Sequence, residues 1–419
     1  MPLSMQPPRY HFAPSQTWAN DPNGLIWHQG VWHLFFQCNP EGVDWGNMSW
    51  GHATSPDLIT WQEQPIALRW DEREQFFSGS CVFDARNSSG LGTDESPALV
   101  AIYTAVLPDG IQAQSLAYSL DAGLTWQRYP GNPVLDRGSA NFRDPKVFRH
   151  DNSWVMVAVE AEQQTVVLYR STDLISWDYL SSFGPAHAAA GAWECPDLFP
   201  LPVAGTEELR WVLLVNLNPG AVAGGSGCQY FVGEFDGTRF VPERDAGVAI
   251  RGASEGPDLR GFDWFDHGRD CYAVVSFADP PDGRRIVLGW MNNWDYAAEV
   301  PLTGGRGMMT IPRELWLVRR DGRHLLAQRP VRELPTEALR RVRLADGENL
   351  TFGAATLAFT DGALRVAREP VDFDARFAGT TSVQIAGSPE GVELDVLVDT
   401  CSIEVFSTDG LVAITNLVI

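Results

Sequence analysis

Three acidic residues open three similar segments of the chain and occupy the same position in each. Asp21 lies in the string Asn-Asp-Pro-Asn-Gly, Asp144 in Arg-Asp-Pro, and Glu194 in Glu-Cys-Pro. Carboxyl groups that meet in one pocket repel one another when ionised, and this separates their pKa values as acid–base chemistry requires. Two carboxyl groups that flank a glycosidic bond act as nucleophile and acid/base in retaining glycosidases. The three residues are therefore candidates for that chemistry.

Each of these acids also has an ordinary structural explanation when it is taken alone. Asp-Pro and Asn-Gly steps are common in turns, where an Asp side chain accepts bonds from its own backbone. Three acids at one position of a repeat, each beside an aromatic residue or Arg, favour a shared site for the set. Calcium needs six or more oxygen ligands, and no Asp-x-Asp-x-Asp-Gly loop occurs, so we expect no metal and no cofactor.

Several polar and aromatic residues follow strand-like runs and are candidates to line a pocket. The chain carries 16 Trp and 21 Phe, which suit either a large β core or stacking on sugar rings. Each of these residues alone also fits a place in the core or in a turn. Together they combine hydrogen-bonding groups with flat apolar surface, as a ligand pocket does. These candidates are Gln37, Asn39, Trp45, Phe77 and Ser78.

Other chemistries find little support in the sequence. Gly224-Gly-Ser-Gly227 lacks the Gly-Lys-Ser/Thr step and the following helix of a phosphate cradle, so we interpret it as a flexible loop. No Gly-x-Ser-x-Gly elbow is present. The six cysteines include no Cys-x-x-Cys pair, which favours free buried thiols over a zinc site.

The elements that must position these residues form a repeat. A phrase that begins with Ser and ends with Thr-Trp or Ser-Trp occurs at residues 55–61, 119–126 and 171–177. A second phrase, in which a turn leads into two apolar runs, begins near residues 20, 77, 143, 195 and 263. The apolar runs are short, β-branched or aromatic and bounded by turns, which predicts strands. The clearest are Val31–Phe36, Leu99–Tyr103, Trp154–Ala158, Trp211–Val215 and Ile286–Trp290.

Five all-β units in about 300 residues predict a five-bladed β-propeller. A β-solenoid or two sandwiches are the alternatives, but a solenoid has a shorter and more regular period than these units. Equivalent positions of a radial repeat converge, so the three acids are expected at one end of the central channel. Beyond residues 311–315 the repeat stops.

The C-terminal part reads differently from the repeats. Residues 331–343 are charged and tolerate a helix. The runs within residues 350–419 alternate in polarity, and turns are expected at Thr360-Asp-Gly362 and Thr408-Asp-Gly410. Residues 392–406 predict two paired strands, which favours a small β-sandwich. We therefore expect an all-β chain with a catalytic propeller domain over residues 1–325 and a linker and C-terminal β-sandwich over residues 326–419.

Charge and hydropathy limit the partners. A net charge of −22 argues against a polyanion such as nucleic acid and is compatible with a neutral substrate. No run of about 18 apolar residues occurs, so no membrane span is expected. Residues 1–9 lack an apolar leader segment, which favours a cytoplasmic location, or secretion if the sequence is a processed form.

Six ordered motifs resemble glycoside hydrolase family 32, the β-fructosidases that include invertases, levanases and inulinases. The resemblance spans nearly the whole chain, and a chance match to six boxes in family order is negligible. Residues 399–406 are similar to a late sandwich motif of the family, so we expect the chain to be complete. The boxes are Asn20–Gly24, Gln37–Pro40, Trp45-Gly-Asn, Phe77–Ser80, Arg143–Pro145 and Glu194–Pro196.

The resemblance implies a five-bladed propeller followed by a sandwich that packs against it. It also implies that Asp21 is the nucleophile and Glu194 the acid/base, and that Asp144, with Arg143 beside it, holds sugar hydroxyls. Trp294 is similar to a stacking aromatic of the fifth unit. The remaining pocket residues implied by the family are Asn20, Gln37, Trp45, Phe77 and Ser78.

The resemblance leads to the hypothesis of a retaining β-fructofuranosidase that removes terminal β-D-fructofuranosyl units from sucrose, inulin or levan, acting from the chain end. A fructosyltransferase or an endo-fructanase on the same scaffold is the alternative. A carbohydrate-binding propeller without catalysis and an arabinan-degrading relative are further alternatives. The complete acid trio argues against the former and the fructosidase boxes against the latter. In every case the expected partner is a carbohydrate.

Overall fold

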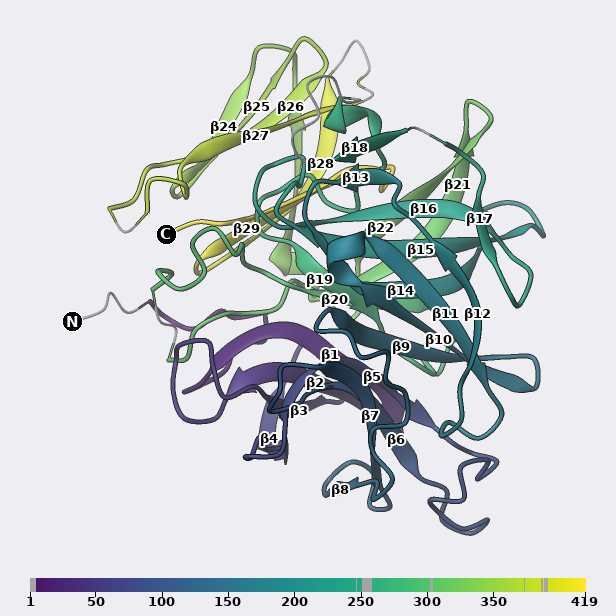
Figure 1. Cartoon of the computed structure of the whole chain (residues 1–419). Coiled ribbons are helices and arrows are strands. Elements are labelled where there is room, and N and C mark those ends of the chain that lie inside the picture. The colour runs from purple at the N-terminus through teal and green to yellow at the C-terminus, as the bar shows by residue number, and fades with distance from the viewer. Residues whose placement is uncertain are drawn as a thin grey trace.

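The computed structural model consists almost entirely of β-strands, which form five four-stranded antiparallel sheets followed by two more four-stranded sheets (Figure 1). It describes residues 5–245, 247–250, 258–301, 304–372, 374–385, 387 and 391–419. The first strands of successive sheets contact one another, and the fifth contacts the first, so they close a ring. The predicted five-bladed propeller and C-terminal sandwich are therefore confirmed.

Each blade is built from one contiguous stretch of chain. The first three blades are β1 (Trp18–His28), β2 (Val31–Asn39), β3 (Ser49–Ser55) and β4 (Gln62–Leu68); β5 (Gln75–Phe83), β6 (Leu99–Val106), β7 (Gln112–Ser119) and β8 (Gln127–Arg128); and β9 (Phe142–His150), β10 (Ser153–Glu160), β11 (Thr165–Ser171) and β12 (Asp178–Phe183). The last two are β14 (Ala192–Pro202), β15 (Leu209–Asn218), β16 (Gly227–Phe235) and β17 (Phe240–Pro242); and β19 (Tyr272–Ser276), β20 (Arg285–Trp290), β21 (Arg313–Arg320) and β22 (Arg323–Pro330).

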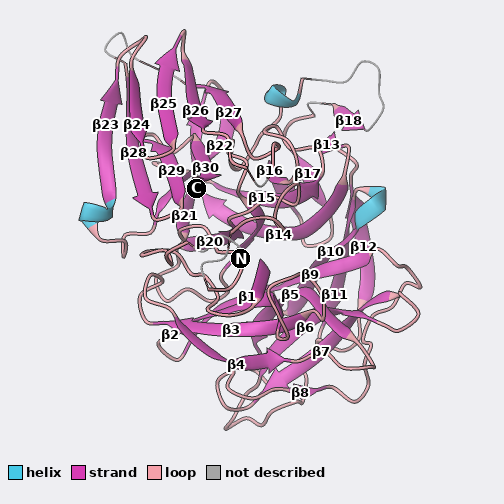
Figure 2. Ribbon diagram, turned by 90° about the vertical axis from the view of Figure 1, so that its left-hand side faces the viewer, coloured by secondary structure: helices cyan, strands magenta, loops and turns pink. Residues whose placement is uncertain are grey.

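The sandwich stands beside the propeller (Figure 2). Its sheets contain β23 (Leu339–Leu344), β28 (Val392–Asp399), β29 (Ser402–Ser407) and β30 (Ala413–Leu417), and β24 (Asn349–Phe352), β25 (Ala355–Thr360), β26 (Ala363–Arg368) and β27 (Gly379–Gln384). A small parallel pair joins β13 (His187–Ala189) to β18 (Val248–Ile250). The short 3₁₀ helices are η1 (Ala161–Gln163), η2 (Leu259–Gly261) and η3 (Thr336–Ala338).

The apolar runs found in the sequence are the second strands of the blades. All five lie within β2, β6, β10, β15 and β20, and nearly all of their side chains are buried. A strand with a neighbour on each side and a sheet packed over each face needs apolar residues at successive positions rather than at alternate ones. Four of the predicted unit starts also fall in first strands, namely β1, β5, β9 and β14.

The predicted start of the fifth unit is wrong, because Asp263 lies nine residues before β19 begins at Tyr272. Asp266 and Asp270 in this stretch accept bonds from residues of β30, with Thr415 N to Asp266 Oδ1 at 2.9 Å and Leu417 N to Asp270 Oδ2 at 2.8 Å. The polar phrase here therefore binds the sandwich and does not open a blade.

The recurring Ser…Trp phrase forms the turn between the third and fourth strands of the first three blades. In the first blade Asp57 Oδ1 accepts bonds from the backbone of Ile59 and Thr60, and Trp61 donates its indole N–H to a carbonyl of the same turn. The third blade repeats these bonds through Asp173. The repeat in the sequence is thus a self-contained turn that sets the outer edge of each blade.

The segment after β22 also differs from expectation. Residues 331–343 were expected to tolerate a helix, but only the short η3 forms, and Leu339–Leu344 pair with β28 as a strand. Val342 and Leu344 are buried in the sandwich core, which explains the strand. Because β22 belongs to the fifth blade and ends at Pro330, we propose the domain boundary within residues 331–338, beyond the predicted residue 325.

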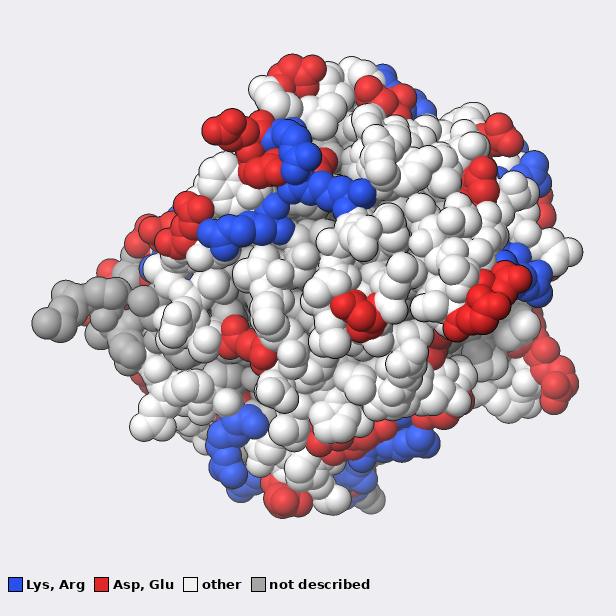
Figure 3. Space-filling view, turned by 90° about the horizontal axis from the view of Figure 1, so that it is seen from below, with Lys and Arg blue, Asp and Glu red and all other residues white. Residues whose placement is uncertain are grey.

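Charged side chains of both signs are interspersed over the face seen in Figure 3, with much uncharged surface between them. Within the described residues, no helix has the length and apolar character needed to cross a lipid bilayer.

The sandwich also binds the segment that precedes the first blade. The backbone N–H groups of Arg9 and Tyr10 donate to the carboxylate of Asp399 at 2.9 Å. The buried His11 ring bridges Asp399 Oδ2 at 2.8 Å and Glu404 Oε1 at 2.7 Å. Glu404 also pairs with Arg313 of the fifth blade at 2.5 Å. One buried network therefore joins the N-terminal segment, the last blade and the sandwich.

This network predicts a pH dependence of stability. Burial alone lowers the pKa of His11, but the bonds to Asp399 and Glu404 outweigh it and raise the pKa from 6.5 to about 9. The folded state therefore holds a proton that the unfolded chain releases. The resulting stability is complete below pH 6.5 and is lost as the pH rises through 9. We expect the free energy of unfolding to fall over this interval by on the order of 2 to 3 kcal/mol in urea titrations.

The matched variant is His11→Gln, which keeps a hydrogen-bonding side chain but cannot carry the proton. Its unfolding free energy should be lower than that of the unmodified chain at pH 6. If its curve between pH 6.5 and 9 fell as steeply as that of the unmodified chain, His11 would not be the group responsible.

Candidate active site

The inner strand of every blade has an irregularity that starts within its first three residues. The ladder slips between Ala19 and Pro22, Phe76 and Gly79, Arg143 and Lys146, Glu194 and Asp197, and Tyr272 and Val275. A bulge of this kind re-aims side chains that a regular strand would send to alternate faces. Asp144, Cys195 and Ala273 take positive φ angles of 63°, 44° and 52° within these irregularities. The fold thus turns the motif residues into the channel.

A cavity of about 250 Å³ lies where these bulges meet. The ten residues that the resemblance implies line this cavity, and Asn218 lines it as well. Asn39, the remaining candidate from the sequence, does not line it and donates instead to the carbonyl of Asp44 at 2.8 Å. The structure therefore brings together residues from all five blades. The predicted residues are Asn20, Asp21, Gln37, Trp45, Phe77, Ser78, Arg143, Asp144, Glu194 and Trp294.

Asp21 is held from two sides. Ser78 Oγ donates to Asp21 Oδ2 at 2.7 Å, and Asn20 Nδ2 donates to Asp21 Oδ1 at 3.0 Å. The Asn20 oxygen accepts the indole N–H of Trp18 at 2.7 Å, which fixes the orientation of the amide. Desolvation and the charge of Glu194 raise the pKa of Asp21, while the bonds from Ser78 and Asn20 lower it. The two donors therefore favour the ionised carboxylate.

Asp144 is almost completely buried beside Cys195. Its Oδ2 accepts the backbone N–H of Cys195 at 2.9 Å, and its own N–H donates to Thr104 Oγ1 at 2.8 Å. Burial, together with the charges of Glu194 and Asp21 and against the opposing charge of Arg143, raises the pKa of Asp144 to about 7. The Cys195 thiol lies 3.5 Å from Asp21 Oδ2 and 3.7 Å from Asp144 Oδ2, so it links the two carboxyl groups.

Glu194 is bound by a cation and a phenol. Arg143 contacts Glu194 Oε1 through Nε at 3.1 Å and through a terminal nitrogen at 3.0 Å. The hydroxyl of Tyr272 donates to Glu194 Oε2. Burial raises the pKa of Tyr272 well above its ordinary value, so the phenol keeps its proton and acts as a donor. Each carboxylate oxygen of Glu194 thus has a fixed partner.

The aromatic residues form two walls of the cavity. Trp294 stacks on Trp18 with ring centres 5.9 Å apart and an interplanar angle of 26°. On the other side Trp45 meets Phe77 edge to face at 6.2 Å, and Trp45 is 51% exposed. The side-chain nitrogen of Gln37 donates to the carbonyl of Phe76 at 2.9 Å, so the side-chain oxygen of Gln37 takes no part in this bond. Flat apolar walls beside fixed polar groups suit a sugar ring.

Two site residues were missed in the sequence. Asn218 ends β15 and precedes Pro219, as Asn39 ends β2 and precedes Pro40, so the repeated Asn-Pro step was a usable signal. Tyr272 directly precedes the register shift of β19, as Glu194 precedes that of β14, but the fifth unit was placed too early for this equivalence to be seen. Among the described residues, no group of three or more His, Cys, Asp or Glu side chains is arranged to hold a metal ion.

The cavity thus brings three acids, one guanidinium and two aromatic walls together in a five-bladed propeller. The chain belongs to glycoside hydrolase family 32. Residues 11–330 match the Glycosyl hydrolases family 32 N-terminal domain, and residues 354–419 match the Glycosyl hydrolases family 32 C terminal domain.

Relatives are found among named proteins and solved structures. The chain is 47% identical over 336 residues to a levanase of Bacillus subtilis, covering 78% of this chain and 47% of the levanase. It is 46% identical over 351 residues to an extracellular exo-inulinase of Aspergillus niger, covering 77% and 64%. The chain thus spans about half to two thirds of the length of these relatives. A crystal structure of an exo-inulinase from Aspergillus awamori superposes with a TM-score of 0.88 at 35% identity, covering 99% of this chain and 94% of that one.

The contacts of Asp21 predict the effect of removing one donor. In Ser78→Ala the ionised Asp21 loses the bond that lowers its pKa, so the acidic limb of the pH–rate profile should move to higher pH. We expect kcat/KM at neutral pH to fall roughly tenfold. The measurement is initial rates of glycoside hydrolysis from pH 4 to 8.

Ser80→Ala is the matched control. Ser80 lies on the same strand and is buried, but it donates to the carbonyl of Pro145 at 2.9 Å rather than to a carboxylate. Its profile should keep the original acidic limb. Equal displacement in both variants would show that the strand, and not the bond to Asp21, is responsible.

Proposed function

We propose that this chain is a retaining β-fructofuranosidase that removes terminal non-reducing β-D-fructofuranosyl units from sucrose or from fructans such as levan and inulin. The observation that carries the proposal is the convergence of Asp21, Asp144 and Glu194 on one cavity with aromatic walls. The family supports the reaction class. Relatives named levanase and exo-inulinase support a fructoside substrate.

In the proposed reaction Asp21 attacks the anomeric carbon while Glu194 gives its proton to the leaving oxygen. Protonated Glu194 carries no charge, so its contribution to the raised pKa of Asp21 disappears in this state. Asp21 is therefore most readily ionised when Glu194 is protonated. After departure of the leaving group, Glu194 is a carboxylate stabilised by Arg143 and Tyr272, and it takes a proton from the water that releases fructose.

Asp144 and Arg143 are proposed to bind sugar hydroxyls. Hydroxyl groups that donate to Asp144 favour its ionised form, and they compensate for the burial and the repulsion that raise its pKa. Such bonds strengthen when the ring flattens towards an oxocarbenium-like state, because positive charge then develops close to the carboxylate. Asp144 would thus contribute more to the transition state than to the ground state.

The relatives named exo-inulinase support action at a chain end. Lys146 of β9 pairs with Asp197 of β14 at 3.2 Å, and both side chains are buried. The exposed Trp45 and the partly buried Trp294 at the walls are placed to contact the next sugar unit.

The cellular location of the protein stays a prediction, and the name of the extracellular exo-inulinase relative supports secretion.

Removal of either reacting carboxylate tests the assignment. Asp21→Ala and Glu194→Ala should each lower kcat by roughly three to five orders of magnitude, since covalent and acid catalysis are lost. The measurement is the rate of fructose release from sucrose by chromatographically pure variants. Asp395→Ala, which removes a carboxylate from a surface ion pair of the sandwich, should keep full activity. Activity close to that of the unmodified chain in Asp21→Ala would refute the proposed nucleophile.

A product time course distinguishes hydrolysis at chain ends from the alternatives. Sucrose, inulin and levan are each offered at low and high concentration, and products are separated by chromatography. We expect free fructose from the first time point and a slowly shortening polymer. Early short oligomers would identify an endo-acting enzyme, whereas larger products or dianhydrides at high substrate would identify a fructosyltransferase. Absence of products from all three would overturn the proposed function.

A further inference from the structure

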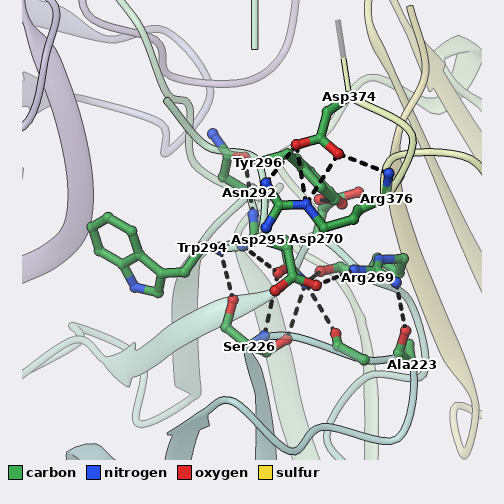
Figure 4. Close-up of polar contacts among 12 residues, drawn as sticks. Ala223, Ser226, Arg269, Asp270, Asn292, Trp294, Asp295, Tyr296, Asp374 and Arg376 are labelled. Atoms are coloured by element: carbon green, nitrogen blue, oxygen red, sulfur yellow. Dashed lines mark hydrogen bonds and ion pairs between the residues drawn. The ribbon is translucent and has the colours of Figure 1, made fainter. Parts of the chain in front are cut away.

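The wall residue Trp294 is carried by a connection that the sandwich holds in place. This connection joins β20 to β21, and its turn begins at Asn293, whose carbonyl accepts the N–H of Tyr296 at 3.1 Å. The N–H of Trp294 donates to Ser226 Oγ at 3.1 Å, and the indole extends away from the polar cluster around its backbone (Figure 4). Trp294 is therefore the tip of a short turn with anchors on both sides.

The first anchor comes from the fourth blade. Asn293 Oδ1 accepts the N–H groups of Ser226 at 3.3 Å and Asp295 at 3.0 Å, and its Nδ2 donates to the carbonyl of Arg269 at 2.7 Å. A Cβ atom on Gly225 would lie 2.0 Å from Asn293 Oδ1, so only glycine fits there. The glycine-rich segment, interpreted from the sequence as a flexible loop, is packed tightly against this turn.

The second anchor comes from the sandwich. Tyr296 donates its hydroxyl to Asp270 Oδ1 at 2.6 Å, and Arg368 of β26 donates to the Tyr296 oxygen at 2.7 Å. Arg368 also pairs with Asp270 Oδ2 at 2.6 Å. The three side chains are 6%, 1% and 0% exposed for Arg368, Tyr296 and Asp270. A buried triangle thus fixes the turn two residues beyond Trp294.

Further contacts join the same turn to the last strand of the chain. Arg269 pairs with Asp295 at 2.6 Å, and its backbone N–H donates to Asn416 Oδ1 at 3.1 Å. Arg368 donates to the carbonyl of Leu417 at 3.1 Å. The turn that carries Trp294 is therefore held by β26 of one sandwich sheet and β30 of the other.

We infer that the sandwich is a positioning element of the substrate pocket, which acts through Arg368 and Tyr296 on Trp294. Tyr296 and Arg368 are positioning residues, because neither lines the cavity. The hydrogen bonds among Tyr296, Arg368 and Asp270 limit the orientations that the turn can adopt. They thereby keep the indole of Trp294 packed against Trp18, so that this wall is formed before a sugar binds. The inference rests on the proposed function in one respect, namely that a sugar binds against Trp294.

The test removes one oxygen from the triangle. Tyr296→Phe keeps the ring packed against Phe377 and leaves the Arg368–Asp270 ion pair in place, so the fold is retained. The turn loses its bond to Asp270 and to Arg368. We expect KM for sucrose to rise roughly two- to tenfold with kcat changed less than about twofold, because binding to the wall weakens while the acids stay in place.

A double-mutant cycle separates positioning from general destabilisation. Tyr296→Phe is made in the unmodified chain and in Trp294→Ala, and KM, kcat and the unfolding midpoint are measured for all four proteins. The rise in KM caused by Tyr296→Phe should vanish when Trp294 is already absent, since coupled residues deviate from additivity. The same rise in both backgrounds, or none in either, would overturn the inference.

Tyr169→Phe is the matched control. Tyr169 is also buried and its hydroxyl also accepts a bond from an arginine, Arg137, at 2.6 Å, but it lies on the third strand of the third blade and does not line the cavity. It should lower the unfolding midpoint without changing KM; a change in KM equal to that of Tyr296→Phe would overturn the inference.

The inference can also be tested separately from the proposed function. If the unmodified chain hydrolyses none of the three sugars, the proposed function fails. Calorimetric binding of fructose to the same four proteins then tests the coupling alone. Weaker binding on Tyr296→Phe only where Trp294 is present supports the inference, and equal or undetectable binding in all four contradicts it.

Discussion

Negative charge concentrated in one small pocket is the constraint on which much of this structure depends. Asp21, Asp144 and Glu194 share a cavity of about 250 Å³ in a chain whose net charge is −22. Arg143 is the cation among the residues that line it. Ser78, Tyr272 and the backbone of Cys195 supply further donors, one set to each acid. The acids can coexist because each has a different set of hydrogen-bond and ion-pair partners.

The propeller meets this constraint through repetition with local irregularity. Five inner strands form a ring, and each one slips out of register near its beginning. Residues from all five blades line one cavity. A regular strand would send every second side chain into the space between blades. The positive φ angles of Asp144 and Cys195 persist because the surrounding sheets and the acid–amide bond fix them. The geometry of the acid cluster is thus a property of the ring as a whole.

Much of this arrangement could be predicted from sequence because it is local and repeated. The second strands are apolar runs, the outer turns of the first three blades carry the Ser…Trp phrase, and the acids recur one or two residues before a proline. The contact between Tyr272 and Glu194 could not be predicted in this way, since it spans 78 positions and depends on how two blades meet. The start of the fifth blade was misplaced because Asp266 and Asp270 serve the sandwich, a role that no repeat reveals. Residues 339–344 became a strand through pairing with β28, far along the chain.

The buried network that joins the N-terminal segment to the sandwich has a consequence for the order in which the molecule folds. His11 finds its partners at Asp399 and Glu404, 388 and 393 positions later in the chain. A nascent chain leaves the ribosome with its N-terminus first. All five blades therefore emerge before His11 can bind Asp399 and Glu404. The first and fifth blades also meet without this network, for example where Ala19 N donates to the Arg306 carbonyl at 2.7 Å. The ring of blades can therefore close during synthesis, whereas the link from the N-terminal segment to the sandwich forms only when the last sheet has emerged.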